Sequence, residues 1–168
     1  MSFFTGLSTT QIQSLTTTQI AGILTSDIVT LTNDQIVALK TSQIAALNAA
    51  DVRALTIDQI VALRTAQVAA LNTADVRALT TEQIIVLTTA QTTTLKTAQI
   101  AALNTSDIQT LTNDQVVALK TSQIAIFSTA DIRALTTDQI MALTTQQLAV
   151  LNTAAECVND FETRKLEN

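Results

Sequence analysis

The stretch Thr32-Asn33-Asp34-Gln35-Ile36-Val37-Ala38-Leu39 decides the fold, because close variants of it fill most of the chain. From Ser8 to Leu151 the sequence divides without a gap into 18 such octads (144 residues over eight). The fourth position is always Gln or Asp, the fifth is aliphatic except at Thr92, and the eighth is Leu except at Ile23 and Phe127. Disordered tracts do not place aliphatic residues on so strict a lattice, so the pattern predicts a folded repeat protein.

A period of eight excludes one continuous helix. A helical seam needs apolar residues every 3.5 to about 3.67 residues, whereas eight residues over two turns would give about 4.0 per turn. The chain must therefore bend once in every octad. The fifth and eighth positions are three apart and share one face of a short helix, which we expect to face the core.

The polar positions predict where each helix begins. Thr is common at the second position and is a good N-cap, and in several octads an acid follows it, which favours a helix N-terminus. Asn, Lys or Arg often stands at the first position, where it suits the end of the preceding helix. We expect a helix of about six residues and a two-residue corner in each octad. The acids concerned are Asp34, Asp58, Glu82, Asp114 and Asp138.

Helices this short are unstable alone, so they must stack on their neighbours. The expected fold is an all-α solenoid of about 18 short helices, one per octad. Its predicted core includes Ile36, Leu39, Ile60, Leu63, Ile84, Leu87, Ile108 and Leu111. The structural alternative is a three-sided β-solenoid, which Thr, Val and Ile would suit. The scarcity of Gly, the many Ala, Leu and Gln, and the absence of alternation favour helices.

A second period of 24 residues concerns the aspartates at the fourth position. They stand at 27, 51 and 75, and then at 107 and 131, so one step is 32 instead of 24. Three octads per superhelical turn would explain this period and would stack Asp51 near Arg77. Helical hairpins with two octads per layer are the alternative. The additional octad, Thr88–Leu95, is where we expect the rod to be irregular around Thr92–Thr94.

The two ends depart from the octad pattern, as solenoid caps do. We divide the chain into an N-terminal cap (1–7), the octad solenoid (8–151) and a C-terminal capping helix (152–168). Phe3, Phe4 and Phe161 lie at these ends, either as plugs that close the core or as contacts between copies. Cys157 is interpreted as a small buried hydrophobic residue.

Composition excludes several functions. The chain of 168 residues has no His and one Cys, which removes the commonest metal sites and nucleophile–base pairs. We therefore expect no catalytic residues, no cofactor and no bound metal; regular aspartates without a Gly-bearing loop do not make a calcium site. Nine basic residues against 14 acidic ones and 2% aromatic residues argue against nucleic acid. No apolar run is long enough to span a membrane.

The functions that remain possible are structural and binding roles. A rod that repeats along one axis exposes an end surface like the inside of its own stack, and such contacts build filaments. The leading prediction is a head-to-tail assembly with itself. The alternatives are a monomeric protein-binding scaffold and an ice-binding protein that uses rows of Thr. No secretory signal is visible, so we expect either an extracellular location reached by another route or a cytoplasmic one.

Two stretches resemble a known repeat. Leu-Thr-Thr-Asp-Gln-Ile-Met-Ala-Leu (135–143) and Leu-Lys-Thr-Ala-Gln-Ile-Ala-Ala-Leu (95–103) are similar to the tandem ALTTAQI octapeptides of large bacterial surface proteins of the haem-utilisation or adhesion type. The resemblance covers Ser8 to Leu151. It implies a bacterial, extracellular, non-enzymatic protein. Haem is not expected, because Cys157 and two Met are the only residues that resemble usual axial ligands.

Overall fold

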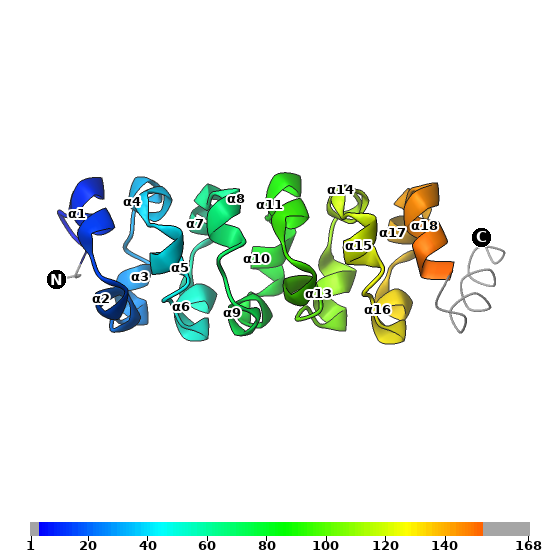
Figure 1. The fold of residues 1–168 in the computed structure, drawn as a ribbon, viewed down its shortest axis with the longest axis horizontal. Helices are drawn as coiled ribbons and strands as arrows, with labels where there is room; N and C mark the ends of the chain where they lie inside the picture. The colour runs from blue at the N-terminus through cyan, green and yellow to red at the C-terminus, as the bar shows by residue number, and fades with distance from the viewer. Residues whose placement is uncertain (1–3, 153–168) are drawn as a thin grey trace.

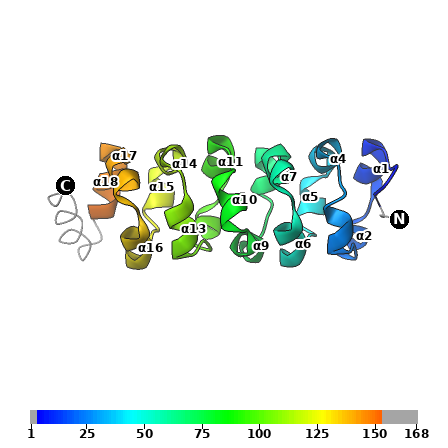
Figure 2. The same ribbon diagram turned by 180° about the vertical axis from the view of Figure 1, so that it is seen from behind.

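The computed structural model describes residues 4–152, which form an elongated rod of 18 short helices without a strand in that range. Figures 1 and 2 show the helices arranged in rows along the rod, with the described chain running from one end to the other. Each octad contributes one helix. The prediction of an all-α solenoid is therefore confirmed, and the β-solenoid alternative is excluded for the described residues.

The helices are four to eight residues long. Their bounds are α1 Thr9–Ser14, α2 Thr17–Ala21, α3 Thr25–Ile28, α4 Asn33–Ala38, α5 Thr41–Ile44, α6 Ala49–Ala54, α7 Ile57–Ala62, α8 Thr65–Val68, α9 Thr73–Ala78, α10 Thr81–Ile85, α11 Thr89–Thr94, α12 Thr97–Ile100, α13 Thr105–Thr110, α14 Asn113–Ala118, α15 Thr121–Ile124, α16 Thr129–Ala134, α17 Thr137–Ala142 and α18 Thr145–Asn152.

The N-cap is the first position of the octad, so the prediction that the second position caps the helix was wrong. In α4 the Thr32 hydroxyl accepts the Gln35 N–H at 3.2 Å, and the Gln35 Oε1 accepts the Thr32 N–H at 2.9 Å. These reciprocal bonds form a capping box. Where Lys40 stands at the N-cap, only the bond from its N–H to Gln43 remains, at 2.7 Å. Such residues are therefore N-caps of the following helix, and their effect on the end of the preceding helix stays a prediction.

Each corner consists of two successive extended residues, at the eighth position and the next first position. Leu39 has φ −58° and ψ 136°, and Lys40 has φ −72° and ψ 156°. No described residue other than Gly6 has a positive φ. The left-handed conformation expected at Asn is therefore absent from these corners, since Asn48 has φ −99° and caps α6. Extended corners need neither Gly nor Pro.

Three octads make one turn of the coil, because the strong helix contacts join each helix to the third one after it, as in α4 with α7 and α6 with α9. This arrangement excludes stacked hairpins. It also continues through α11, which packs against both α8 and α14 and keeps its capping box. The predicted irregularity at Thr92–Thr94 is therefore wrong. Thr92 occupies a core position at 1% exposure and donates its hydroxyl to the Thr88 carbonyl at 3.0 Å.

The core is one continuous cluster along the rod, built from the fifth and eighth positions. The eight residues predicted for it are all between 0% and 6% exposed: Ile36, Leu39, Ile60, Leu63, Ile84, Leu87, Ile108 and Leu111. Phe4 and Leu7 extend the same lattice toward the N-terminus, and Phe4 is 1% exposed. Residues 4–7 thus repeat the spacing of an octad's fifth and eighth positions.

Candidate functional site

The feature that recurs in nearly every turn is a ladder of buried glutamines at the fourth position. The Gln91 Nε2 donates to the Leu63 carbonyl at 2.7 Å and to the Ile60 carbonyl at 2.9 Å, while its Oε1 accepts the Thr88 N–H at 2.8 Å. One side chain therefore closes its own helix and binds the turn beneath. We call this set the glutamine ladder: Gln35, Gln43, Gln59, Gln67, Gln83, Gln91, Gln99, Gln115, Gln123, Gln139 and Gln147.

The ladder follows from the coil geometry. With three octads per turn, a helix stacks over the third helix before it, and its first turn lies over the preceding corner. The Nε2 of each ladder glutamine accordingly donates to a corner carbonyl 28 residues earlier, at 2.6 to 2.9 Å. These carbonyls end short helices and have no partner within them. The octad pattern identifies Gln or Asp at every fourth position but does not specify the carbonyl that each Gln contacts in the turn beneath.

Aspartate replaces glutamine in five octads, and there the ladder lacks its donor. Asp75 is 0% exposed; its Oδ2 accepts the Asn72 N–H at 2.9 Å, and its Oδ1 has no partner. Asp51 is arranged in the same way on Asn48, at 3.2 Å. Burial raises the pKa of Asp51 and of Asp75, while hydrogen bonds from the capping Asn lower it. The charge of Asp51 further raises the pKa of Asp75.

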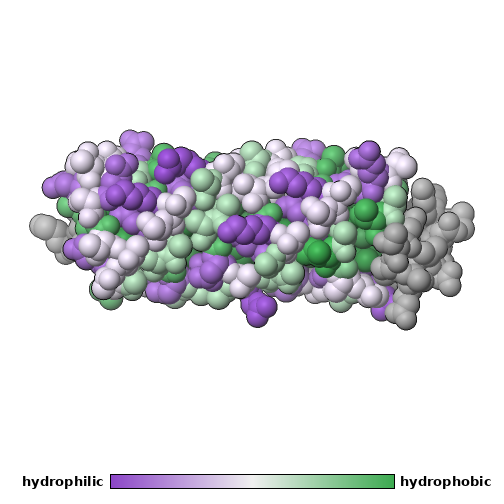
Figure 3. All heavy atoms as spheres, viewed as in Figure 1, coloured by the Kyte–Doolittle hydropathy of each residue, from purple (hydrophilic) through white to green (hydrophobic). Residues whose placement is uncertain are grey.

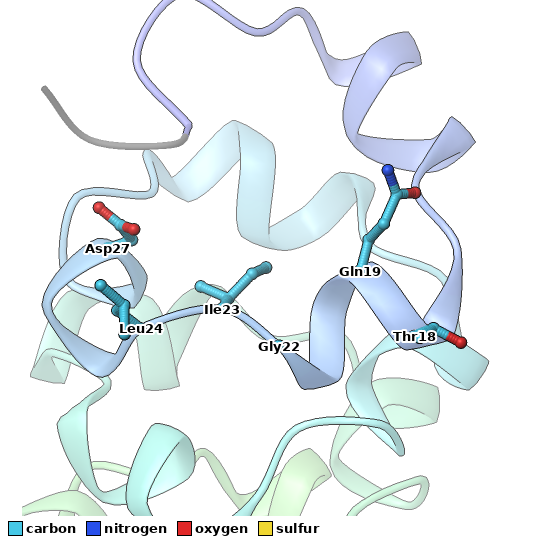
Figure 4. A pocket seen from close by; sticks show the side chains of 6 residues that line it. All are labelled: Thr18, Gln19, Gly22, Ile23, Leu24 and Asp27. Carbon is cyan, nitrogen blue, oxygen red and sulfur yellow. The ribbon is translucent and has the colours of Figure 1, made fainter.

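The ladder is open at the α1–α3 end of the rod. The Gln11 Oε1 accepts the Ser8 N–H at 2.8 Å and the Gln19 Oε1 accepts the Thr16 N–H at 2.9 Å, but neither Nε2 donates a hydrogen bond. A pocket opens beside Gln19. Figure 4 shows its lining from α2, α3 and the link between them: Thr18, Gln19, Gly22, Ile23, Leu24 and Asp27. Leu24 is 68% exposed here, so this end presents both apolar surface and free donors.

The opposite end presents the complementary groups. Among residues 4–152, the corner carbonyls of Phe127, Leu135 and Leu143 accept no hydrogen bond, whereas each corner carbonyl 28 residues before a ladder glutamine accepts one from that glutamine. On the face of the rod seen in Figure 3, hydrophilic and weakly apolar residues are intermixed, and the strongly apolar areas are small.

Threonines at the first and second positions of the octad have two structural roles. Eight of them are N-caps whose hydroxyls accept an N–H, as at Thr56 with Gln59. Those at the second position instead begin the helices. Four of them, on α2, α5, α8 and α11, are exposed and make no hydrogen bond with their hydroxyls: Thr17, Thr41, Thr65 and Thr89. Because these helices stack on one another, the four form a row along one face.

The predicted assembly contacts are placed only in part. Phe4 is buried in the core, and the Gln35 Nε2 donates to its carbonyl at 3.2 Å, so its ring offers almost no surface to a second copy. Phe3, Phe161, Cys157 and nearly all of the predicted capping helix 152–168 lie outside the described residues. Within residues 4–152, no group of three or more His, Cys, Asp or Glu side chains could hold a metal ion, and no helix is long and apolar enough to cross a membrane.

Comparison with known proteins agrees with the octad lattice. The model of the ALTTAQ repeat matches four successive segments, residues 28–65, 60–97, 93–121 and 117–153. No curated protein matches the chain. The matched segments together span 28–153, which is three quarters of the sequence and the part that contains every glutamine of the ladder. The chain therefore belongs to the ALTTAQ repeat family.

Proposed function

We propose that this protein is a non-enzymatic structural repeat protein whose rods associate head to tail into an extracellular filament, matrix or adhesive surface structure. The observation that carries the proposal is the open ladder. Gln11 and Gln19 offer free Nε2–H groups at one end, and the corner carbonyls of Leu135 and Leu143 are free acceptors at the other. Heterologous contacts of this kind continue without closing when the rotation between copies is that of the coil itself.

A second copy fits this end better than an unrelated partner. Inside the rod the same donor–acceptor pair is satisfied in every glutamine layer at 2.6 to 2.9 Å. Another rod would supply these carbonyls at the required spacing, together with apolar side chains for Leu24 and its pocket. Buried unpaired donors are costly, so hydrogen-bond matching would also fix the register between copies.

The test removes the donors and keeps the caps. Gln11→Glu with Gln19→Glu retains the oxygen that accepts the N-cap N–H but deletes both Nε2–H donors. Gln13→Glu with Thr17→Glu is the matched control, since these exposed residues lie on the same helices and the charge change is equal. Sedimentation velocity over a range of concentrations, followed by electron microscopy, measures assembly. Oligomers that persist in the control and disappear in the first variant support the proposal.

Two results would overturn it. A wild-type chain that stays monomeric at high concentration would have no self-association to explain. Equal loss of oligomers in both variants would mean that net charge at this end, and not the ladder donors, controls assembly. The monomeric alternative is a binding scaffold, and the exposed apolar residues Val37, Val61 and Ile85, which recur every 24 residues, would be its side face.

The threonine row favours a second candidate, ice binding. Thr17, Thr41, Thr65 and Thr89 keep free hydroxyls on one exposed face, and small residues such as Ser42 and Ala66 stand beside them. Thermal hysteresis of the freezing point measures this activity. Thr65→Lys should abolish it, and Ile57→Lys, at the second position of α7 outside the row, should leave it unchanged. Absence of hysteresis in the wild type would eliminate this candidate.

A further inference from the structure

The aspartate layers leave two kinds of oxygen without a donor. In the ladder, a corner carbonyl 28 residues before each glutamine accepts its Nε2–H. Where aspartate stands instead, the corresponding carbonyls accept no hydrogen bond. These pairs are Asp51 with Ile23, Asp75 with Leu47, Asp107 with Leu79 and Asp131 with Leu103. The first two aspartates also carry a buried Oδ1 without a partner.

The repeat fixes where that Oδ1 points. The Asp75 Oδ2 accepts the Asn72 N–H, which is the role that Oε1 has in every glutamine layer. The Oδ1 of the carboxylate therefore corresponds to the Nε2 of a glutamine side chain. In the glutamine layers the Nε2 is directed at the corner carbonyl of the turn beneath. By this correspondence with the glutamine layers, the Asp75 Oδ1 is directed toward the Leu47 carbonyl.

The space between these two oxygens suits one small group with two donors. Aspartate is one methylene shorter than glutamine, so its carboxylate stops short of the position of the Nε2. The other nearby carbonyl, that of Ile44, already accepts the Leu47 N–H at 3.1 Å. The two acceptors that have no partner at all are Oδ1 and the Leu47 carbonyl. A water molecule has two hydrogens, and buried waters typically bridge polar groups that would otherwise be unsatisfied.

We propose that one buried water bridges the Asp75 Oδ1 and the Leu47 carbonyl, and that an equivalent water bridges the Asp51 Oδ1 and the Ile23 carbonyl. Each water donates one hydrogen to the carboxylate and one to the carbonyl. It takes the place that the amide group has in the glutamine ladder, so a water bridges the turns at these two aspartates where an amide bridges them at the glutamines. A divalent cation fits less well, because it requires about six to eight oxygen ligands and this site has one carboxylate.

The test exchanges the two kinds of layer. A high-resolution crystal structure of the wild type should show a water within about 3 Å of both oxygens. In Asp75→Gln the Nε2 should occupy that position and expel the water. The variant should also raise the urea midpoint of unfolding, because a direct bond replaces a buried charge. Asp58→Gln is the control, since Asp58 is exposed and the charge change is the same; it should leave the midpoint nearly unchanged.

Three outcomes would overturn the proposal. The first is the absence of a water at both sites in a structure that shows other buried waters. The second is a urea midpoint that is higher in KCl or NaCl than in tetramethylammonium chloride at equal ionic strength for the wild type, but equal in these salts for Asp75→Gln. Such a result would mean that a cation occupies the site. The third is a ¹³Cγ resonance of Asp75 in its neutral range at pH 7.5, because the carboxyl would then donate its own proton to Leu47. If Asp75→Gln does not fold, Asp51→Gln replaces it.

Discussion

Replacing one ladder glutamine by leucine tests whether the ladder holds successive turns together. Gln91 is 2% exposed and lies in the middle of the rod. In Gln91→Leu the side chain keeps a similar volume, and the Thr88 hydroxyl still accepts the N–H of residue 91. The Thr88 N–H and the Leu63 carbonyl lose their only partners. The Ile60 carbonyl keeps its bond from the Leu63 N–H, at 3.3 Å.

The expected loss follows from these two orphaned groups. A buried carbonyl without a partner, such as that of Leu63, costs about 1 to 3 kcal/mol; the N–H of the exposed Thr88 costs less because water can reach it, and the apolar leucine offsets part of the total. We expect the free energy of unfolding to fall by about 1 to 3 kcal/mol. Urea unfolding followed by circular dichroism measures it, with the denaturant slope checked because repeat arrays can lose cooperativity. Gln109→Leu is the control, because this side chain is exposed and should change stability by less than about 0.5 kcal/mol.

A loss for Gln91→Leu equal to that of the control would refute the reasoning. It would mean that the Nε2 bonds to Ile60 and Leu63 add nothing to stability beyond what water provides. A reduced slope with an unchanged midpoint would instead show that the rod has separated into two folding units at this layer.

Two further predictions concern the core and the aspartate column. Leu63→Ala removes a side chain that is 4% exposed and should cost about 2 to 5 kcal/mol in urea unfolding; a cost below about 0.5 kcal/mol would mean that the site collapses without a cavity. Burial raises the pKa of Asp51, Asp75 and Asp107, so the folded chain holds more protons than the unfolded chain above the ordinary value of 3.8. The free energy of unfolding should therefore fall as pH rises from that value through the raised folded values, and Asp51→Asn with Asp75→Asn should flatten this dependence in unfolding curves measured at several pH values. A wild-type stability that rises over the same range would contradict the sign.

The core could be predicted from the sequence because buried positions are marked by aliphatic residues. Ile60 and Leu63 recur at fixed positions of every octad, and that lattice alone identifies the buried face. The cap was misplaced by one position because Thr often fills both the first and second positions, as in Thr88-Thr89. The spacing of three residues from Thr88 to Gln91 is the signature of a capping box and distinguishes the two. The partners of Gln91 at Ile60 and Leu63 are 31 and 28 residues away, and no local pattern specifies them.

The additional octad Thr88–Leu95 shows which period the fold obeys. The coil continues through α11 with three octads per turn, and Gln91 makes the same bonds as any other ladder glutamine. This octad therefore leaves the backbone coil intact, but after it each residue of the 24-residue pattern lies on the neighbouring column of helices. Asp51 and Asp75 lie in one column of helices, α6 and α9, whereas Asp107 lies on α13, in the column of α4, α7 and α10. The octad is thus the structural unit, and the 24-residue period is a surface pattern that can be shifted from face to face by adding one unit, without any change in the coil that carries it.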